Sequence, residues 1–164
     1  MGHGYTYKCD KCHFEYSVYL GIGMRYPVVY TRTLDEIDEG KHGAEWQELY
    51  RETPYAAIDA ANVIYICTDC NYWEKGTDIT LYAPNDPKSI PHKQYGEKTV
   101  SQWGYVPYVM DWELKEEYHV LKRYYHRCSR CGKRMHKATD AELRKLPCPK
   151  CGYTNEVNMP MMWD

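Results

Sequence analysis

The chain of 164 residues has no apolar run as long as the roughly eighteen residues that a membrane-spanning helix needs, so we expect no membrane partner. Its N-terminus lacks a basic segment followed by an apolar one, so we expect no secretory signal and a cytoplasmic location. The sequence also lacks G-x-S-x-G, H-E-x-x-H, a P-loop and a glycine-rich dinucleotide fingerprint. Nothing in it indicates catalysis, and we expect a non-enzymatic protein.

Phenylalanine is nearly missing, with one residue against eighteen tyrosines. Tyrosine supplies apolar area with a polar tip and is favoured at interfaces. We therefore expect a small, half-exposed core built with tyrosine. An aromatic contact surface for a partner is the alternative.

No cysteine is left over once the cysteines are grouped by spacing. Each of the eight belongs to a Cys-x-x-Cys pair, and the pairs are Cys9/Cys12, Cys67/Cys70, Cys128/Cys131 and Cys148/Cys151. Such a pair is half of a tetrahedral thiolate metal site, so four pairs predict two sites. Paired cysteines in the cytosol are more often metal ligands or redox centres than structural disulfides. The sequence thus predicts two structural Zn²⁺ ions.

Each pair is expected to form a tight turn, here called a knuckle, whose backbone N–H groups point at the sulfurs. Glycine follows the last two pairs, at Gly132 and Gly152, and allows the positive φ that this turn needs. His13 and Asn71 stand at the equivalent positions of the first two pairs. Both residue types tolerate positive φ better than most, so the knuckle geometry is expected at all four pairs.

Four pairs can combine into two sites in three ways. Sequential pairing closes the shortest loops and is the arrangement that the spacing favours. It joins Cys9, Cys12, Cys67 and Cys70 around a fifty-four-residue insert, and it joins the last two pairs across sixteen residues. A catalytic zinc ion keeps one coordination position open for water or substrate, whereas four thiolates occupy every position of a tetrahedral ion. Both metals are therefore expected to be structural.

The spacing and glycines of residues 126–152 resemble the zinc-ribbon superfamily. Residues 7–16, with an aromatic before the knuckle and two after it, are similar to the first knuckle of rubredoxins, although the second knuckle lacks the Pro and Gly of that family. The resemblance covers the knuckles and implies fold and metal ligation, not a task. It leaves two alternatives open. One is iron at the first site with a role in electron transfer, and the other is a thiol redox switch.

Periodicity predicts an α+β fold of small mixed domains, with short hairpins and a few short helices built on two four-cysteine zinc ribbons. Strands are expected at 14–20, 63–66 and 79–82, and helices after capping boxes at Thr33 and Thr139, at 44–51 and, with Asp111 as N-cap, at 112–122. We predict a first domain over 1–83 with an insert at 13–66, a loop-rich connection over 84–110, and a helix with a compact ribbon over 111–164. The apolar segment 159–163 docks on the body or on a partner.

Charge suggests where a partner binds. The formal net charge is −2, and two zinc–tetrathiolate centres would make it −6, which does not suggest a nonspecific nucleic-acid binder. Residues 115–151 carry a net +7 and residues 32–59 a net −5. We expect a macromolecular partner, protein rather than nucleic acid; the alternative is nucleic-acid binding by the basic residues of 122–150. The expected contacts are Arg127, Arg130, Lys133, Arg134 and Lys137.

Overall fold

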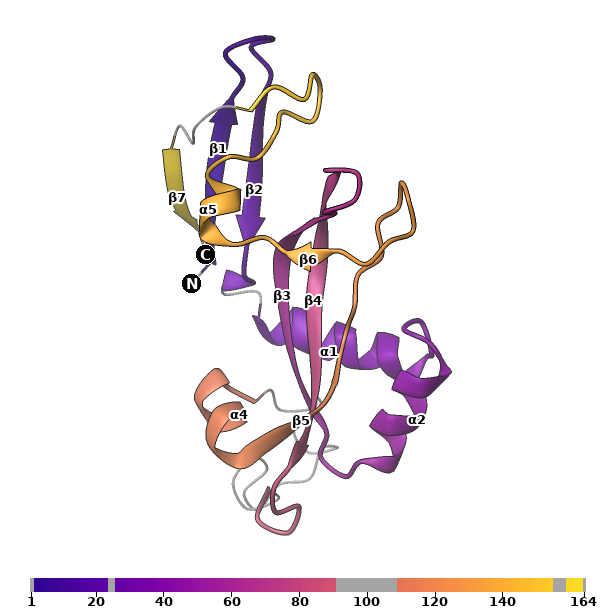
Figure 1. The fold of residues 1–164 in the computed structure, drawn as a ribbon. Helices are drawn as coiled ribbons and strands as arrows, with labels where there is room; N and C mark the ends of the chain where they lie inside the picture. The colour runs from indigo at the N-terminus through magenta and orange to yellow at the C-terminus, as the bar shows by residue number, and fades with distance from the viewer. Residues whose placement is uncertain (1, 24–25, 91–108, 155–158, 164) are drawn as a thin grey trace. The chain divides into compact units, whose positions relative to one another are not determined.

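The computed structural model describes residues 2–23, 26–90, 109–154 and 159–163. Within these ranges the chain forms seven strands in two antiparallel sheets together with four short helices. The predicted α+β class is therefore confirmed (Figure 1).

The first sheet has three strands in the order β2-β1-β7. β1 (Gly2–Lys8) and β2 (Glu15–Leu20) form a hairpin around the first cysteine pair, as the alternation of polar and apolar residues predicted. β7 (Met159–Trp163) pairs antiparallel with β1, and the Trp163 Nε1 donates to the His3 carbonyl at 3.0 Å. The C-terminal segment, whose docking site the sequence left open, thus lies on the body of the protein.

The second sheet has four strands in the order β5-β4-β3-β6. The long strands β3 (Ala57–Ile66) and β4 (Trp73–Pro84) contain the two strands predicted in this region, and the second cysteine pair lies between them. β6 (His136–Lys137) pairs with the end of β3, beside Tyr65 and Ile66. β5 (Tyr118–Arg123) pairs with the far end of β4.

The helix predicted over 112–122 is wrong in its second half. α4 spans only Asp111–Glu117, and the chain then continues as β5. These residues form a strand because their backbone groups pair with β4 from Thr80 to Pro84, and this pairing outweighs the local helical periodicity. The N-cap is Met110 rather than Asp111, since the Glu113 carboxylate accepts the Met110 backbone N–H at 2.7 Å.

The remaining helices partly follow the predictions. α1 (Tyr26–Asp38) begins seven residues before the predicted cap; the Thr33 hydroxyl donates to the Val29 carbonyl at 2.8 Å, inside the helix, so the capping box there is wrong. α2 (Ala44–Glu52) follows the predicted break at the glycines. α5 (Asp140–Leu143) has the predicted capping box, with Thr139 and Glu142 bonded reciprocally.

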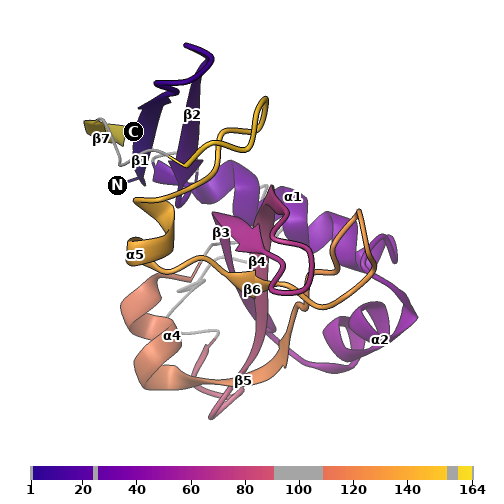
Figure 2. The same ribbon diagram turned by 45° about the horizontal axis from the view of Figure 1, so that its top comes forward.

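The chain divides into two compact units, each built from segments that are separated in the sequence. One unit comprises Met1–Met24, Ala61–Asp78 and Tyr125–Asp164, and it holds all eight cysteines. The other comprises Arg25–Ala60 and Ile79–Tyr124, and it holds α1, α2, α4 and β5. β3 and β4 contribute residues to both units; Figure 2 gives a second view of the elements. We call the first the cysteine unit.

The cysteine unit has a hydrophobic core whose residues come from separate segments of the chain. It joins Tyr5 and Tyr7 of β1 and Val18 and Leu20 of β2 to side chains from β3 and from the segment around α5.

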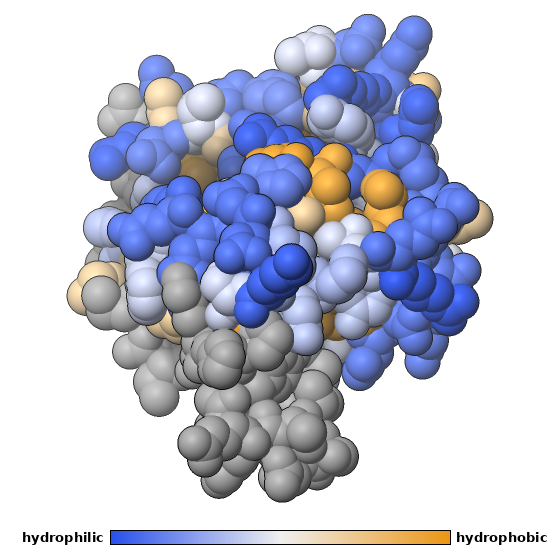
Figure 3. Space-filling model, turned by 90° about the horizontal axis from the view of Figure 1, so that it is seen from below, coloured by the Kyte–Doolittle hydropathy of each residue, from blue (hydrophilic) through white to orange (hydrophobic). Residues whose placement is uncertain are grey.

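Among the described residues, no helix is both long and apolar enough to span a membrane. Figure 3 shows one face on which hydrophilic residues predominate and hydrophobic ones form small clusters. The predicted loop-rich connection over 84–110 falls mostly outside the described residues.

Candidate metal centres

All four cysteine pairs adopt one backbone geometry. In each knuckle the N–H of the first cysteine bonds to the carbonyl five residues on, at 2.8–3.0 Å, and the N–H four residues on returns to the carbonyl of that cysteine, at 2.8–2.9 Å. The pairs of bonds join Cys9 with Phe14 and His13, Cys67 with Tyr72 and Asn71, Cys128 with Lys133 and Gly132, and Cys148 with Tyr153 and Gly152. The predicted knuckles are therefore present at every pair.

The residue after each second cysteine has positive φ, as predicted. The values are 56° at His13, 54° at Asn71, 73° at Gly132 and 72° at Gly152. Histidine and asparagine thus take the conformation that glycine takes in the last two knuckles. The absence of glycine from the first two pairs does not prevent the turn.

The knuckles meet in two tetrads that can hold metal ions. Tetrad 1 combines the first and last pairs, Cys9, Cys12, Cys148 and Cys151; tetrad 2 combines the two middle pairs, Cys67, Cys70, Cys128 and Cys131. The predicted sequential pairing is wrong, and so is the interpretation of residues 126–152 as one ribbon. The iron alternative also loses its proposed ligand set, since Cys9 and Cys67 belong to different tetrads. Tetrad 2 is inserted between the two halves of tetrad 1.

The nested arrangement costs little in loop entropy. Because the closure cost rises only by about 0.6 kcal/mol for each doubling of loop length, nesting costs roughly 2 kcal/mol more than sequential pairing. Burying a single large apolar side chain contributes about as much. The side chains of β1 and β2 that pack on Leu143 and Leu146 supply several such burials, so packing decides which pairs meet.

The sulfur positions fit a tetrahedral metal. The Sγ atoms are 3.5 Å apart for Cys9 and Cys151 and 3.7 Å apart for Cys12 and Cys148. In tetrad 2 the Cys67–Cys131 and Cys70–Cys128 separations are 3.5 and 3.6 Å. A tetrahedron with Zn–S bonds of about 2.3 Å has edges of about 3.8 Å. The separations also exceed the roughly 2.05 Å of a disulfide. The donor set therefore fits a closed four-thiolate site.

The thiols within a tetrad perturb one another. Burial acts to raise the pKa of Cys9, but hydrogen bonds from the Cys12 backbone N–H and the Cys151 thiol outweigh it and lower the pKa to about 7. At Cys12 the Phe14 backbone N–H acts to lower the pKa, yet burial and the neighbouring thiols raise it to about 12. Four thiolates this close repel one another, so ionising all of them requires a central cation.

Tyrosines of the first hairpin anchor the last knuckle of tetrad 1. The Tyr7 hydroxyl donates to the Leu143 carbonyl, and the Tyr16 hydroxyl donates to the Leu146 carbonyl at 3.1 Å. The two rings stack with centroids 4.6 Å apart and planes 6° apart. Burial, followed by the charge of Cys148, raises the pKa of Tyr16, so its hydroxyl stays protonated as a donor. These contacts bring the Cys148 knuckle to the Cys9 knuckle.

Tetrad 2 lies against a separate small core. Tyr65 and Met135 are buried with Cys67 and Cys128. The Glu74 carboxylate on β4 binds the facing knuckle, since it accepts the Ser129 hydroxyl at 2.7 Å and the Ser129 N–H at 3.2 Å. Neither Glu74 nor its neighbour Trp73 was predicted as a site residue, because no spacing rule connects them with ligands from another segment.

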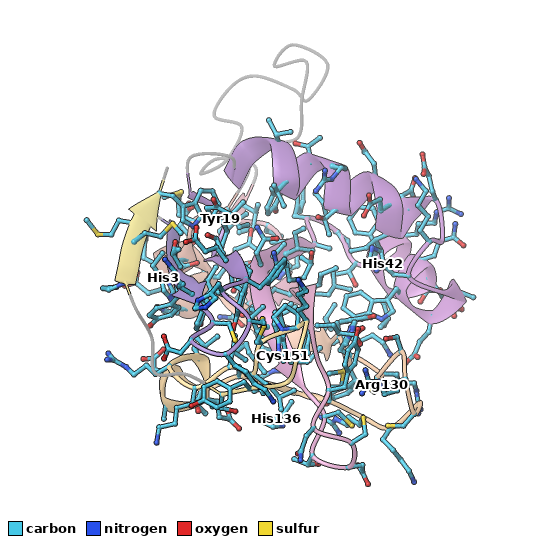
Figure 4. The ribbon with its side chains drawn as sticks, turned by 90° about the horizontal axis from the view of Figure 1, so that it is seen from above. His3, Tyr19, His42, Arg130, His136 and Cys151 are labelled. Atoms are coloured by element: carbon cyan, nitrogen blue, oxygen red, sulfur yellow. The ribbon has the colours of Figure 1, made fainter. Side chains whose placement is uncertain are left out.

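The five predicted contact residues are all exposed and lie in the cysteine unit. The Arg130 guanidinium lies 4.4 Å from the centre of the Tyr72 ring, and that of Arg134 lies 3.7 Å from the centre of the Tyr125 ring. Lys137 pairs with Asp78 at 3.0 Å, and Arg127 donates to the Gly132 carbonyl. Figure 4 labels Arg130, which stands between Cys128 and Cys131 of tetrad 2 in the sequence, and Cys151 of tetrad 1.

Comparison with protein-family models, with curated proteins and with solved structures finds no match to this chain. The likeness to zinc ribbons therefore rests on the knuckles and on the two tetrads, which are consistent with ribbon-like sites. Structural metal binding is the function that these residues indicate directly.

Proposed function

We propose that this protein is a non-enzymatic, cytoplasmic binding protein whose cysteine unit is held in shape by two structural Zn²⁺ ions. The observation that carries the proposal is the closed thiolate geometry of both tetrads, with paired sulfurs 3.5–3.7 Å apart. Four thiolates occupy all coordination positions of a tetrahedral ion, so such an ion stabilises the fold and leaves no position for a substrate. The eight cysteines would be its ligands.

The proposed partner is an acidic segment of another protein. It would bind the basic knuckle, which we define as Arg127, Arg130, Lys133 and Arg134, with Lys137 at its margin. Four cations within eight residues outnumber the two net negative charges of the zinc–tetrathiolate centre that this knuckle would help to form, so the local charge stays positive. Stacking on Tyr72 and Tyr125 limits the rotation of two guanidinium groups, which lowers the entropy lost when a carboxylate binds them.

The same stacking favours protein over nucleic acid. Proteins that bind single strands commonly use open aromatic faces on which bases stack. Here the guanidinium groups of Arg130 and Arg134 cover one face of each ring beside the knuckle. The net charge of −6 expected with two zinc ions also opposes nonspecific attraction to phosphate.

Metal analysis tests the first part of the proposal. Purified protein is expected to be colourless and to contain two zinc ions per chain, and chelation in mild denaturant should unfold the cysteine unit. A red protein with thiolate-to-iron absorption would replace the proposal by electron transfer. Loss of metal with formation of intramolecular disulfides under mild oxidant would replace it by a redox switch.

Fluorescence anisotropy tests the partner class. The probes are a labelled Asp/Glu-rich peptide and labelled single- and double-stranded oligonucleotides, each titrated at low and moderate salt. The variant Arg130→Glu/Arg134→Glu is compared with Arg144→Glu/Lys145→Glu, which changes the net charge equally at two exposed positions outside the basic knuckle. We expect the peptide to bind and only the first variant to lose it.

Other outcomes contradict the proposal. Equal loss in both variants would mean that peptide binding reflects net charge alone. Tighter binding of an oligonucleotide, with a steep decrease as salt rises, would favour the nucleic-acid alternative.

A further inference from the structure

Two consecutive residues of β4, Trp73 and Glu74, connect the two tetrads. They follow Cys70 by three and four positions, so the second knuckle carries them directly. We propose that they are positioning residues that couple metal binding at the two tetrads, so that filling one raises the affinity of the other. The inference rests on the proposed metal binding, and all of its contacts lie within the cysteine unit.

Glu74 ties the two halves of tetrad 2 together. One carboxylate oxygen lies 2.9 Å from the His126 Nε2, and the other accepts the Ser129 hydroxyl at 2.7 Å. Ser129 lies between Cys128 and Cys131, while His126 stacks on Tyr65 with centroids 4.4 Å apart. The side chains of Glu74 and His126 are 18% and 19% exposed, so the bond between them is partly shielded from water, whereas the bonds to Ser129 are exposed. The position of β4 therefore depends on tetrad 2 being assembled.

Trp73 reaches from the same strand to tetrad 1. Its indole Nε1 donates to the Pro147 carbonyl at 2.8 Å, and the next residue is the ligand Cys148. Its ring stacks on Tyr16 with centroids 6.0 Å apart and planes 28° apart. Tyr16 in turn donates to the carbonyl of Leu146. Trp73 thus holds the knuckle that closes tetrad 1.

The coupling follows from these two connections. An ordered tetrad 2 fixes β4 and presents the Trp73 N–H to Pro147, so tetrad 1 needs less ordering to assemble. Coupling between two binding equilibria is reciprocal, so an ordered tetrad 1 assists tetrad 2 by the same factor. A partly buried neutral hydrogen bond such as that of Trp73 corresponds to a factor of roughly three to ten in affinity.

Native mass spectrometry of the full-length chain at less than stoichiometric zinc tests the proposal. The spectra give the populations of chains with zero, one and two zinc ions. From these populations we form one ratio, which is the product of the empty and doubly filled populations divided by the square of the singly filled population. For two independent sites this ratio has a fixed statistical upper limit. We expect wild-type protein to exceed that limit.

The variant Trp73→Phe keeps an aromatic ring but removes the N–H donor. We expect it to lower that ratio by roughly threefold to tenfold while still binding two zinc ions. Trp46→Phe, at a buried tryptophan of α2 in the other unit, is the matched control and should leave the ratio unchanged. An unchanged ratio in Trp73→Phe would overturn the role of Trp73.

A second measurement covers the case in which Trp73→Phe fails to fold. In Cys67→Ser/Cys70→Ser protein, which lacks tetrad 2, zinc affinity at tetrad 1 is measured by chelator competition and should be lower than in wild type by the same factor. Equal affinity would overturn the coupling. Two zinc ions bound without coupling contradict only this inference, whereas a chain that binds no metal contradicts the proposed function.

Discussion

Arg130 lies over the ring of Tyr72, and Lys150 takes the equivalent position over Phe14. Each cation immediately precedes the second cysteine of its knuckle, and each ring lies two residues beyond the second cysteine of the facing knuckle. The guanidinium carbon of Arg130 is 4.4 Å from its ring centre, and the Nζ of Lys150 is 5.9 Å from its own. The two tetrads therefore share side-chain packing as well as backbone geometry.

This equivalence predicts unequal effects of removing the two cations. Arg130→Ala should lower the free energy of unfolding by about 0.5–1 kcal/mol, the usual contribution of an exposed cation–π contact. Lys150→Ala should cost less, because its nitrogen lies near the limit of the effective distance. Chemical denaturation of the zinc-loaded proteins measures both values. A larger loss in Lys150→Ala would contradict the ranking.

Zinc stoichiometry of two quadruple variants tests the nested pairing. Serine at positions 9, 12, 148 and 151 removes one whole tetrad and should leave one tightly bound zinc ion. Serine at positions 9, 12, 67 and 70 breaks both tetrads and should leave none. Sequential pairing predicts the reverse, because the second variant would then retain one complete site. A chromogenic chelator after mild denaturation gives the counts.

The third knuckle should accept asparagine in place of its glycine. Gly132 has a φ of 73°, and nothing within 4 Å would contact an added Cβ, so the backbone conformation alone limits substitution. Asn71 adopts this conformation in the second knuckle. Gly132→Asn should therefore cost little, whereas Gly132→Val should cost about 1–2 kcal/mol. Thermal unfolding of both variants, with zinc content as the control for ligation, checks this difference.

The carboxylate of Glu142 should make a pH-dependent contribution to stability. The Thr139 backbone N–H, opposed by burial and assisted by His136, holds the pKa of this carboxyl below its ordinary value. A lowered pKa in the folded state stabilises the protein above the pKa of the unfolded chain, and the effect is lost as pH falls through the folded value. Glu142→Gln should cost about 0.5–1 kcal/mol at neutral pH.

The difference between wild type and Glu142→Gln should then shrink in acid. Comparing the two proteins at each pH removes the contribution of acid-induced metal release, because both have the same tetrads. Urea denaturation at a series of pH values measures the difference. A gap that stays constant from neutral pH to below the pKa of a free carboxyl would contradict the role of the charge.

Local features could be predicted where a few neighbouring residues determine them. Thr139 and Glu142 marked α5 because they bond to each other's backbone within one turn. The period-two alternation after Phe14 marked β2 because its alternate side chains face the core. The helix start expected at Thr33 was wrong because a threonine hydroxyl can bond inside a helix as well as at its start. The helix expected through Tyr118 ended early because pairing with β4 is not visible in local sequence.

The sequence by itself determined the chemistry of this protein: four Cys-x-x-Cys knuckles, enough sulfur for two closed sites, and a basic third knuckle. Only the tertiary structure decided that Cys9 meets Cys151 and that Cys67 meets Cys131. The four pairs are chemically alike, and loop entropy distinguishes their combinations by only roughly 2 kcal/mol. The contacts of Tyr7, Tyr16 and Trp73 with the segment before Cys148 outweigh that difference, and they join residues more than seventy positions apart.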